Sequence, residues 1–221
     1  MKKYVIAVLF ILMISISIVI PLNFIRNEAI QFKDDALEYA VREAVGKLDG
    51  NIYLQEIEHI TVLDLEGYGI RDITGLENFK NLEKLILRDN DIVDITPLSE
   101  LDSLQVLDLR GNIISDIYPL RNLTNLEDLN LRGNFISDIS PLENLVLLRE
   151  LNIRDNSIED ISVLSNFKLL KDLNIRYNYI EDIGPLEDLP SLYQRLYLEG
   201  NIIGDFSPVA SYYDYIEEKD F

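Results

Sequence analysis

Apolar and polar positions repeat along most of the chain with a period of 22 residues. Each unit opens on the pattern L-x-x-L-x-L, places an asparagine three residues after the last of these apolar positions, and continues to D-I-x-P-L or a close variant. A fixed period of this length predicts a solenoid of stacked units that share one core. Aligned on the first apolar position, and with a one-residue insertion near Leu192, seven units begin at Ile60, Leu82, Leu104, Leu126, Leu148, Leu170 and Tyr193.

The unit that begins at Leu104 shows which element each part of the repeat should form. Leu107 and Leu109 alternate with outward-facing positions, which is the period-2 pattern of a strand with one buried side. The apolar positions between Ile114 and Leu123 return to the same core from the convex side. This is the leucine-rich repeat pattern. It predicts an α/β repeat fold with a parallel β-sheet on the concave face and short helical turns on the convex side.

Two polar columns run beside the apolar ones. The first column is predicted to be structural, because a buried asparagine can hydrogen-bond the turning backbone of neighbouring units; it contains Asn90, Asn112, Asn134, Asn156, Asn178 and Asn201. Tyr68 takes this place in the first unit, as is common in terminal repeats. The second column is predicted to cap short helical turns with proline near their first position; it contains Asp72, Asp94, Asp116, Asp138, Asp160, Asp182 and Asp205.

The segments beside the repeats are predicted to cover the two ends of the core. Apolar positions at helical spacing predict a helix over residues 34–46, with Asp35 and Glu38 as a capping box and Gly46 as its end. A second helical turn is expected around Tyr53–His59, and residues 207–221 should form the other lid. The expected domains are a helical cap at 31–59, seven repeats at 60–213 and a C-terminal cap or tail at 214–221.

Residues 1–30 predict export. Lys2 and Lys3 precede 19 uncharged residues at 4–22, which as a helix would span about 29 Å, the thickness of a membrane's hydrocarbon core. The length favours an uncleaved membrane anchor, whereas the small residues around Ser15–Ser17 leave a cleaved signal peptide as the alternative. In either case the positive end stays in the cytoplasm and the remainder is exported.

Charge and composition exclude several classes of function. The formal net charge is −19, and residues 31–221 carry 17 basic and 38 acidic side chains. Such a surface repels nucleic acid and anionic lipid. The sequence contains no cysteine, which rules out disulfides, thiolate metal sites and cysteine nucleophiles.

Catalytic and metal-binding chemistry finds no support in the motifs. The single histidine, His59, has no plausible catalytic partner in the sequence. Phosphate-binding glycine loops, calcium loops and nucleophile elbows do not occur. The acidic segment 88–95 is accounted for by its turn and cap positions. We therefore expect no enzyme activity, no cofactor and no metal.

The repeat unit ending in D-I-x-P-L, behind a helix of the type DDALEYAVREAVGK, resembles the leucine-rich repeat domain of bacterial internalins and internalin-like surface proteins. The resemblance extends from residue 33 to about residue 213. It implies a right-handed solenoid with a helical N-terminal cap, and it implies that the concave strand face binds other proteins.

One arginine stands in the same place of five consecutive units. These residues, Arg88, Arg110, Arg132, Arg154 and Arg176, should lie about 4.8 Å apart on neighbouring strands of the concave face. Two cations at that spacing repel by about 1 kcal/mol in water and by roughly 3 kcal/mol nearer a protein interior, so the row needs counter-charges. One interpretation is a ladder neutralised by Asp108, Asp128, Glu150 and Asp172 on the same face. The other is a recognition stripe for carboxylates or phosphates.

Arg195, Tyr177 and Tyr197 are further candidates for the binding face, since tyrosine and arginine are enriched at binding centres. Together these features predict a monomeric, non-enzymatic, exported module that binds a protein or peptide and is tethered to a membrane through residues 4–22. The alternatives are a structural, self-assembling envelope protein and a regulatory docking subunit of an enzyme.

Overall fold

The computed structural model describes residues 29–221. The predicted anchor or signal at residues 4–22 lies outside this range. Across the described residues, no helix combines the length and the apolar character needed to cross a membrane.

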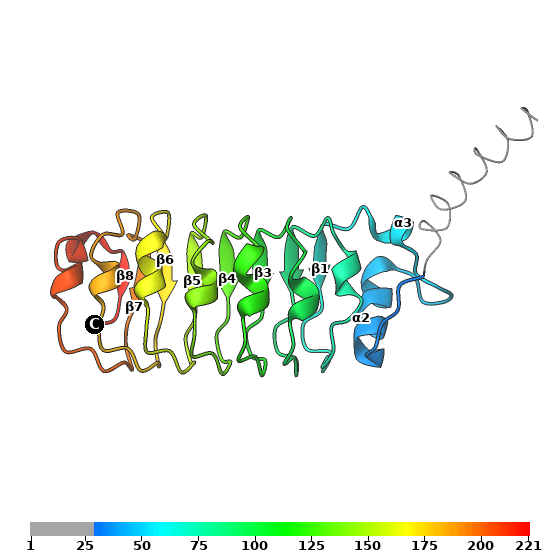
Figure 1. Ribbon diagram of the computed structural model, residues 1–221, viewed down its shortest axis with the longest axis horizontal. Helices are drawn as coiled ribbons and strands as arrows, with labels where there is room; N and C mark the ends of the chain where they lie inside the picture. The colour runs from blue at the N-terminus through cyan, green and yellow to red at the C-terminus, as the bar shows by residue number, and fades with distance from the viewer. Residues whose placement is uncertain (1–28) are drawn as a thin grey trace, which may run out of the picture.

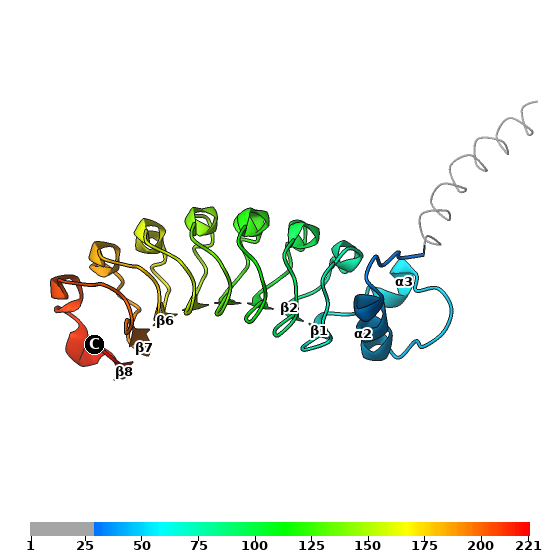
Figure 2. The same cartoon turned by 90° about the horizontal axis from the view of Figure 1, so that it is seen from below.

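Eight short parallel strands stack in chain order into one sheet. The strands are β1 (Val62–Asp64), β2 (Lys84–Ile86), β3 (Val106–Asp108), β4 (Asp128–Asn130), β5 (Glu150–Asn152), β6 (Asp172–Asn174), β7 (Arg195–Tyr197) and β8 (Glu218–Lys219). The sheet forms the inner side of an arc and the short helices form its outer side (Figure 2). The predicted leucine-rich repeat solenoid with a concave parallel sheet is confirmed.

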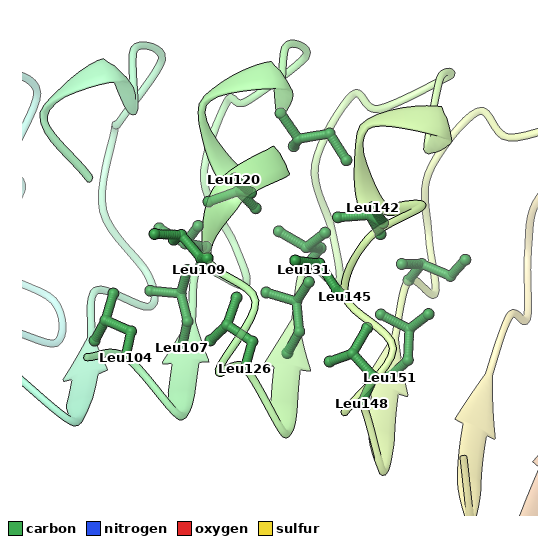
Figure 3. Close-up of a cluster of buried hydrophobic side chains, with 14 of the residues drawn as sticks. Leu104, Leu107, Leu109, Leu120, Leu126, Leu131, Leu142, Leu145, Leu148 and Leu151 are labelled. Carbon is green, nitrogen blue, oxygen red and sulfur yellow. The ribbon is translucent and has the colours of Figure 1, made fainter. Parts of the chain in front are cut away.

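Leucine and isoleucine side chains from every unit fill the space between the sheet and the convex turns. Leu107, Leu129 and Leu151 are paired in register across β3, β4 and β5, and each is at most 1% exposed. Figure 3 shows how the leucines of successive units stack into one continuous core. Burying an aliphatic side chain contributes roughly 1.5–3 kcal/mol, so the stacking of units, rather than any single unit, stabilises the fold.

Short 3₁₀ helices form the convex side. They are η1 (Leu76–Asn78), η2 (Thr96–Leu98), η3 (Tyr118–Asn122), η4 (Ser140–Leu142), η5 (Ser162–Asn166), η6 (Gly184–Leu186) and η7 (Ser207–Val209). A further 3₁₀ helix, η8 (Tyr213–Tyr215), precedes β8 in the C-terminal segment. The Asp116 carboxylate accepts a hydrogen bond from the backbone N–H of Tyr118 at 2.8 Å, and the other six units repeat this bond. The aspartates therefore bond the backbone where the turns begin, but the N-cap position predicted for them belongs to another residue, such as Ile117, which makes no side-chain cap bond.

The asparagine column is confirmed as structural. Asn112 is 5% exposed, and its amide nitrogen donates to the carbonyls of Leu87 and Leu109 at 3.0 and 2.9 Å. Its side-chain oxygen accepts from the N–H of Ile92 at 3.1 Å. Because the side chain joins two units and satisfies three backbone groups, it fixes the turn at the end of each strand.

The N-terminal lid contains the helices α2 (Asp35–Val45) and α3 (Leu54–Ile57), at the end of the solenoid next to β1 (Figure 1). Gly46, at φ 70°, ends α2 as predicted. The predicted capping box of Asp35 and Glu38 is wrong. The cap is Asp34, whose Oδ1 accepts from the N–H groups of Ala36 and Leu37 at 2.8 and 3.1 Å, while Glu38 forms an ion pair with Arg42.

The C-terminal segment does more than cover the core, because Glu218–Lys219 add an eighth strand beside β7. This strand was not predicted from the sequence, which indicated only a cap or tail at 214–221. Near the last unit, Leu192 is 2% exposed whereas Tyr193 is 40% exposed. The buried position that opens this unit therefore belongs to Leu192, and not to Tyr193 as predicted. The inserted residue consequently lies between Leu192 and β7.

Candidate functional site

The five arginines form one row on the exposed face of the sheet. The backbone ladder continues past the strand ends, with Gly111 N–H donating to the carbonyl of Arg132 at 2.8 Å and Gly133 N–H to that of Arg154 at 2.9 Å. The guanidinium groups consequently lie on neighbouring rungs of the solenoid. Their side chains are between 21% and 46% exposed, so solvent and a partner can reach them.

Each arginine of the row has a carboxylate within ion-pair distance, but the partners differ from those predicted. Arg88 pairs with Glu66, and Arg110 pairs with the predicted Asp108 at 3.5 Å. Arg132 and Arg154 share Asp155, at 3.4 and 3.0 Å. The remaining member, Arg176, pairs with Asp220 of the C-terminal segment and lies 3.9 Å from Glu199.

The expectation that Asp128, Glu150 and Asp172 neutralise the row is wrong. These acids stand at the first position of their strands, four residues before an arginine, whereas Asp155 directly follows Arg154 in a left-handed turn at φ 55°. Most units have glycine in this place, while Asp89 and Asp155 are acidic there, so an acidic residue in this turn was a readable signal in the sequence. Asp220 offered no such signal, because it lies 44 residues from Arg176.

The three acids that do not pair with the arginine row form a second feature of the concave face. Asp128, Glu150 and Asp172 stand side by side in register across β4, β5 and β6 and help to line a hollow of about 260 Å³. Arg195 lies directly opposite Asp172 on β7 and forms an ion pair with it, while Asp128 and Glu150 have no ion pair within residues 29–221. Burial, and then the charge of Glu150, raise the pKa of Asp128 to about 6.

Burial also raises the pKa of Asp172, against the opposing effect of Arg195. The hollow is therefore acidic, and its Asp128 carboxylate is partly protonated near neutral pH. Among the described residues, no group of three or more metal-binding side chains is positioned to hold a metal ion.

The tyrosines at the C-terminal end are interleaved with two of the arginines. The guanidinium of Arg154 lies 4.8 Å from the ring centre of Tyr177, and that of Arg176 lies 3.9 Å from the ring centre of Tyr197. The Tyr197 hydroxyl donates to Glu218 of β8 in a bond of 2.5 Å. The structure therefore brings these four predicted residues together, while Arg88 and Arg110 lie at the other end of the row.

Tyr177 has an unusual backbone. It adopts φ 52°, in a column where most units have glycine, and a bulky residue in this region is a conformational outlier. Its ring lies over Gly200, where a Cβ would come within 2.3 Å of the ring. Gly200 therefore provides the space for the Tyr177 side chain, which remains 41% exposed at the edge of the concave face.

The family described as leucine-rich repeats (2 copies) matches residues 80–122 and 124–166. A comparison with curated proteins finds no match. Among solved structures, the internalin InlF of Listeria monocytogenes is 38% identical with a TM-score of 0.81, over 85% of this chain and 56% of that one. Internalin C2 of the same organism is 35% identical with a TM-score of 0.65, over 81% of this chain and 89% of that one.

The fold also extends beyond bacteria. The leucine-rich repeat ectodomain of an Arabidopsis thaliana receptor kinase, solved in complex with Casparian strip integrity factor 2, matches with a TM-score of 0.68 at 24% identity, over 76% of this chain and 22% of that one. The chain spans only 56% of the InlF structure, but it covers most of internalin C2 at more than a third identity. The chain belongs to the internalin-like family of bacterial leucine-rich repeat proteins.

Proposed function

We propose that this protein is a non-enzymatic module that is exported to the bacterial cell surface and binds a protein or peptide on the concave face of its sheet. Leucine-rich repeat proteins of the internalin type are interaction modules, and the plant ectodomain that shares the fold was solved with a bound factor. The proposed binding residues are Arg88, Arg110, Arg132, Arg154, Arg176, Tyr177, Arg195 and Tyr197.

The observation that carries this proposal is the unbroken row of five arginines on one exposed sheet face, which ends in the cluster of Tyr177 and Tyr197. Arg132 has only one ion-pair contact, at 3.4 Å, and it shares that carboxylate with Arg154. A guanidinium has five N–H donors, so most of its hydrogen-bonding capacity faces solvent. Arginines and tyrosines held in place by neighbours lose little entropy on binding, which suits a recognition surface.

Site-specific photo-crosslinking in the producing bacterium would test the concave face. A benzoylphenylalanine replaces Arg132 in one variant of the full chain and Glu143, an exposed residue at the convex side, in the other. We expect a discrete heterologous product from position 132 and none from position 143. Equal products at both positions would contradict the proposal. A product of twice the chain's mass from position 132 would instead support self-assembly.

Export rests on the sequence of residues 1–30, where two lysines precede 19 uncharged residues. We expect residues 31–221 to be cleaved by protease added to intact cells, and the full-length protein to sediment with membranes. Recovery of the protein from the medium with an N-terminus at residue 18 or later would show that the segment is a cleaved signal. Complete protection from protease would contradict export and would favour a cytoplasmic docking subunit.

A further inference from the structure

A second surface lies on the flank of the solenoid, where the chain leaves the sheet for the convex side. There a hollow of about 530 Å³ is lined by Glu159, Asp160, Tyr179, Glu181, Asp182 and Ile202. Tyr179 N–H donates to the carbonyl of Ile158 at 2.9 Å, and Ile202 N–H to that of Ile180 at 3.0 Å, so three consecutive units hold the lining residues on adjacent rungs. The hollow thus has a fixed backbone.

The hollow concentrates negative charge that has no counter-ion. None of its four carboxylates forms an ion pair within the described part of the chain, whereas Glu66, Asp155 and Asp220 pair with members of the arginine row. Asp160 and Asp182 each accept a backbone N–H at 2.7 Å, and for Asp160 this bond lowers the pKa of the carboxyl. Glu159 and Glu181 are exposed. At neutral pH the site therefore attracts cations.

The same hollow exposes apolar surface. Tyr179 is 56% exposed and Ile202 is 57% exposed, on neighbouring rungs. Five other tyrosines in the described range have a lysine or arginine over the ring: Tyr53, Tyr118, Tyr177, Tyr197 and Tyr213. The Tyr179 ring has no such cation from residues 29–221, although it is bordered by carboxylates that would hold one. Its aromatic face is available to a cation from outside.

We propose that this flank hollow docks a basic and apolar segment of a partner protein. A lysine or arginine of the segment lies over Tyr179, within reach of Glu159, Glu181 and Asp182, and a neighbouring apolar side chain packs on Ile202. The charge of the hollow favours a basic segment over an acidic one. The chain carries a net charge of −19 and no basic residue lines the hollow, so an acidic segment would be repelled. The surface is separate from the concave face and adds a second contact to the molecule.

Fluorescence anisotropy with synthetic peptides tests the proposal on the full chain. The probe is a labelled Gly-Lys-Leu-Lys-Leu-Gly peptide, compared with its Glu-for-Lys and Ser-for-Leu counterparts. We expect the basic, apolar peptide to bind most tightly. Replacing Tyr179→Leu should weaken binding about two- to five-fold, as expected for loss of an exposed cation–π contact, and Tyr179→Phe should preserve it. Glu159→Gln with Glu181→Gln should weaken binding about five-fold at low salt.

The charge-matched control is Glu143→Gln with Glu187→Gln, which removes two exposed acids from the convex side. Binding by this control should stay within two-fold of the parent chain, and the same holds for Arg132→Ala on the concave face. An equal loss in the control would show non-specific attraction to an acidic protein and would overturn the proposal. So would unchanged binding by Tyr179→Leu, or no binding of the basic, apolar peptide at millimolar concentration.

Discussion

At the scale of single residues, register decides which acids neutralise which arginines. Asp128 and Arg132 belong to the same strand and its extension, yet the three residues between them place their charged groups at different levels of the face. Asp155 reaches two guanidiniums because its left-handed backbone turns the carboxylate toward them. Asp128 is consequently half-buried beside Glu150, and the charge of Lys84 offsets this only in part, so the folded state holds an unfavourable charge at neutral pH.

This charge predicts how stability depends on pH. The pKa of Asp128 is about 6 in the folded protein against 3.8 as its ordinary value, so the folded state binds more protons between these limits. Ionisation of Asp128 should therefore lower the free energy of unfolding progressively as the pH rises from 4 to 6. After allowance for solvent screening, Asp128→Asn should raise the free energy of unfolding by about 1 kcal/mol at pH 7.5 and leave it unchanged at pH 4.

Urea unfolding at the two pH values measures this difference. Glu143→Gln serves as the control and should change stability at neither pH, because Glu143 is exposed. Equal effects of Asp128→Asn at pH 4 and pH 7.5 would mean that the gain has another origin, such as packing.

At the scale of elements, the strand and its following turn form one unit because the asparagine column links them across rungs. Asn134 donates to the carbonyls of Leu109 and Leu131, both at 3.0 Å, and accepts from the N–H of Ile114 at 3.0 Å. Asn134 is 6% exposed, so water cannot replace these hydrogen-bond partners. Asn201 makes the same contacts in the last unit but is only half-buried.

Asn134→Ala should therefore be more damaging than Asn201→Ala. Removing the Asn134 amide leaves the buried N–H of Ile114 unpaired. The carbonyls of Leu109 and Leu131 each lose one of two bonds, because they still accept from Asn112 and Asn156. The expected loss is therefore about 2 kcal/mol. Asn201→Ala should lose about half as much, because solvent can reach the groups it exposes. Urea unfolding of both variants compares the losses. Equal losses would show that burial does not set the contribution of the column.

At the scale of the whole molecule, the solenoid could be predicted from the sequence because every unit repeats the same pattern of residues. The apolar spacing, the asparagine column and the aspartate column each recur at the same offset, so the stacking was predictable. The features that occur once were not. The strand β8, the pairing of Arg176 with Asp220 and the bonds of Asp34 to the first unit depend on contacts between distant segments. The flank hollow was also missed, because Tyr179 follows a buried asparagine and carries no periodic signal.

Asp34 shows how one such contact couples the lid to the repeats. Its Oδ1 caps α2, while its Oδ2 accepts from the N–H groups of Arg71 and Asp72 at 2.8 and 3.1 Å in the first unit. These backbone bonds lower the pKa of the Asp34 carboxyl although burial opposes them, so the group stays ionised at neutral pH. In a solenoid each unit contacts only its neighbours, and a lid that detaches exposes the core of the first unit alone.

Asp34→Ala should accordingly loosen the N-terminal end without unfolding the whole chain. Loss of the helix cap is expected to destabilise by about 1 kcal/mol, and the two lost bonds to the first unit add a similar amount or more. Hydrogen exchange should then accelerate in residues 36–45 and 70–76 and stay unchanged beyond β4. The control is Asp35→Ala, which removes an exposed acid from the first turn of α2 but not the capping bonds, and it should have a much smaller effect. If Asp34→Ala instead accelerates exchange evenly through β7, the lid and all repeats unfold as one cooperative unit, and stability in this solenoid is not a nearest-neighbour property.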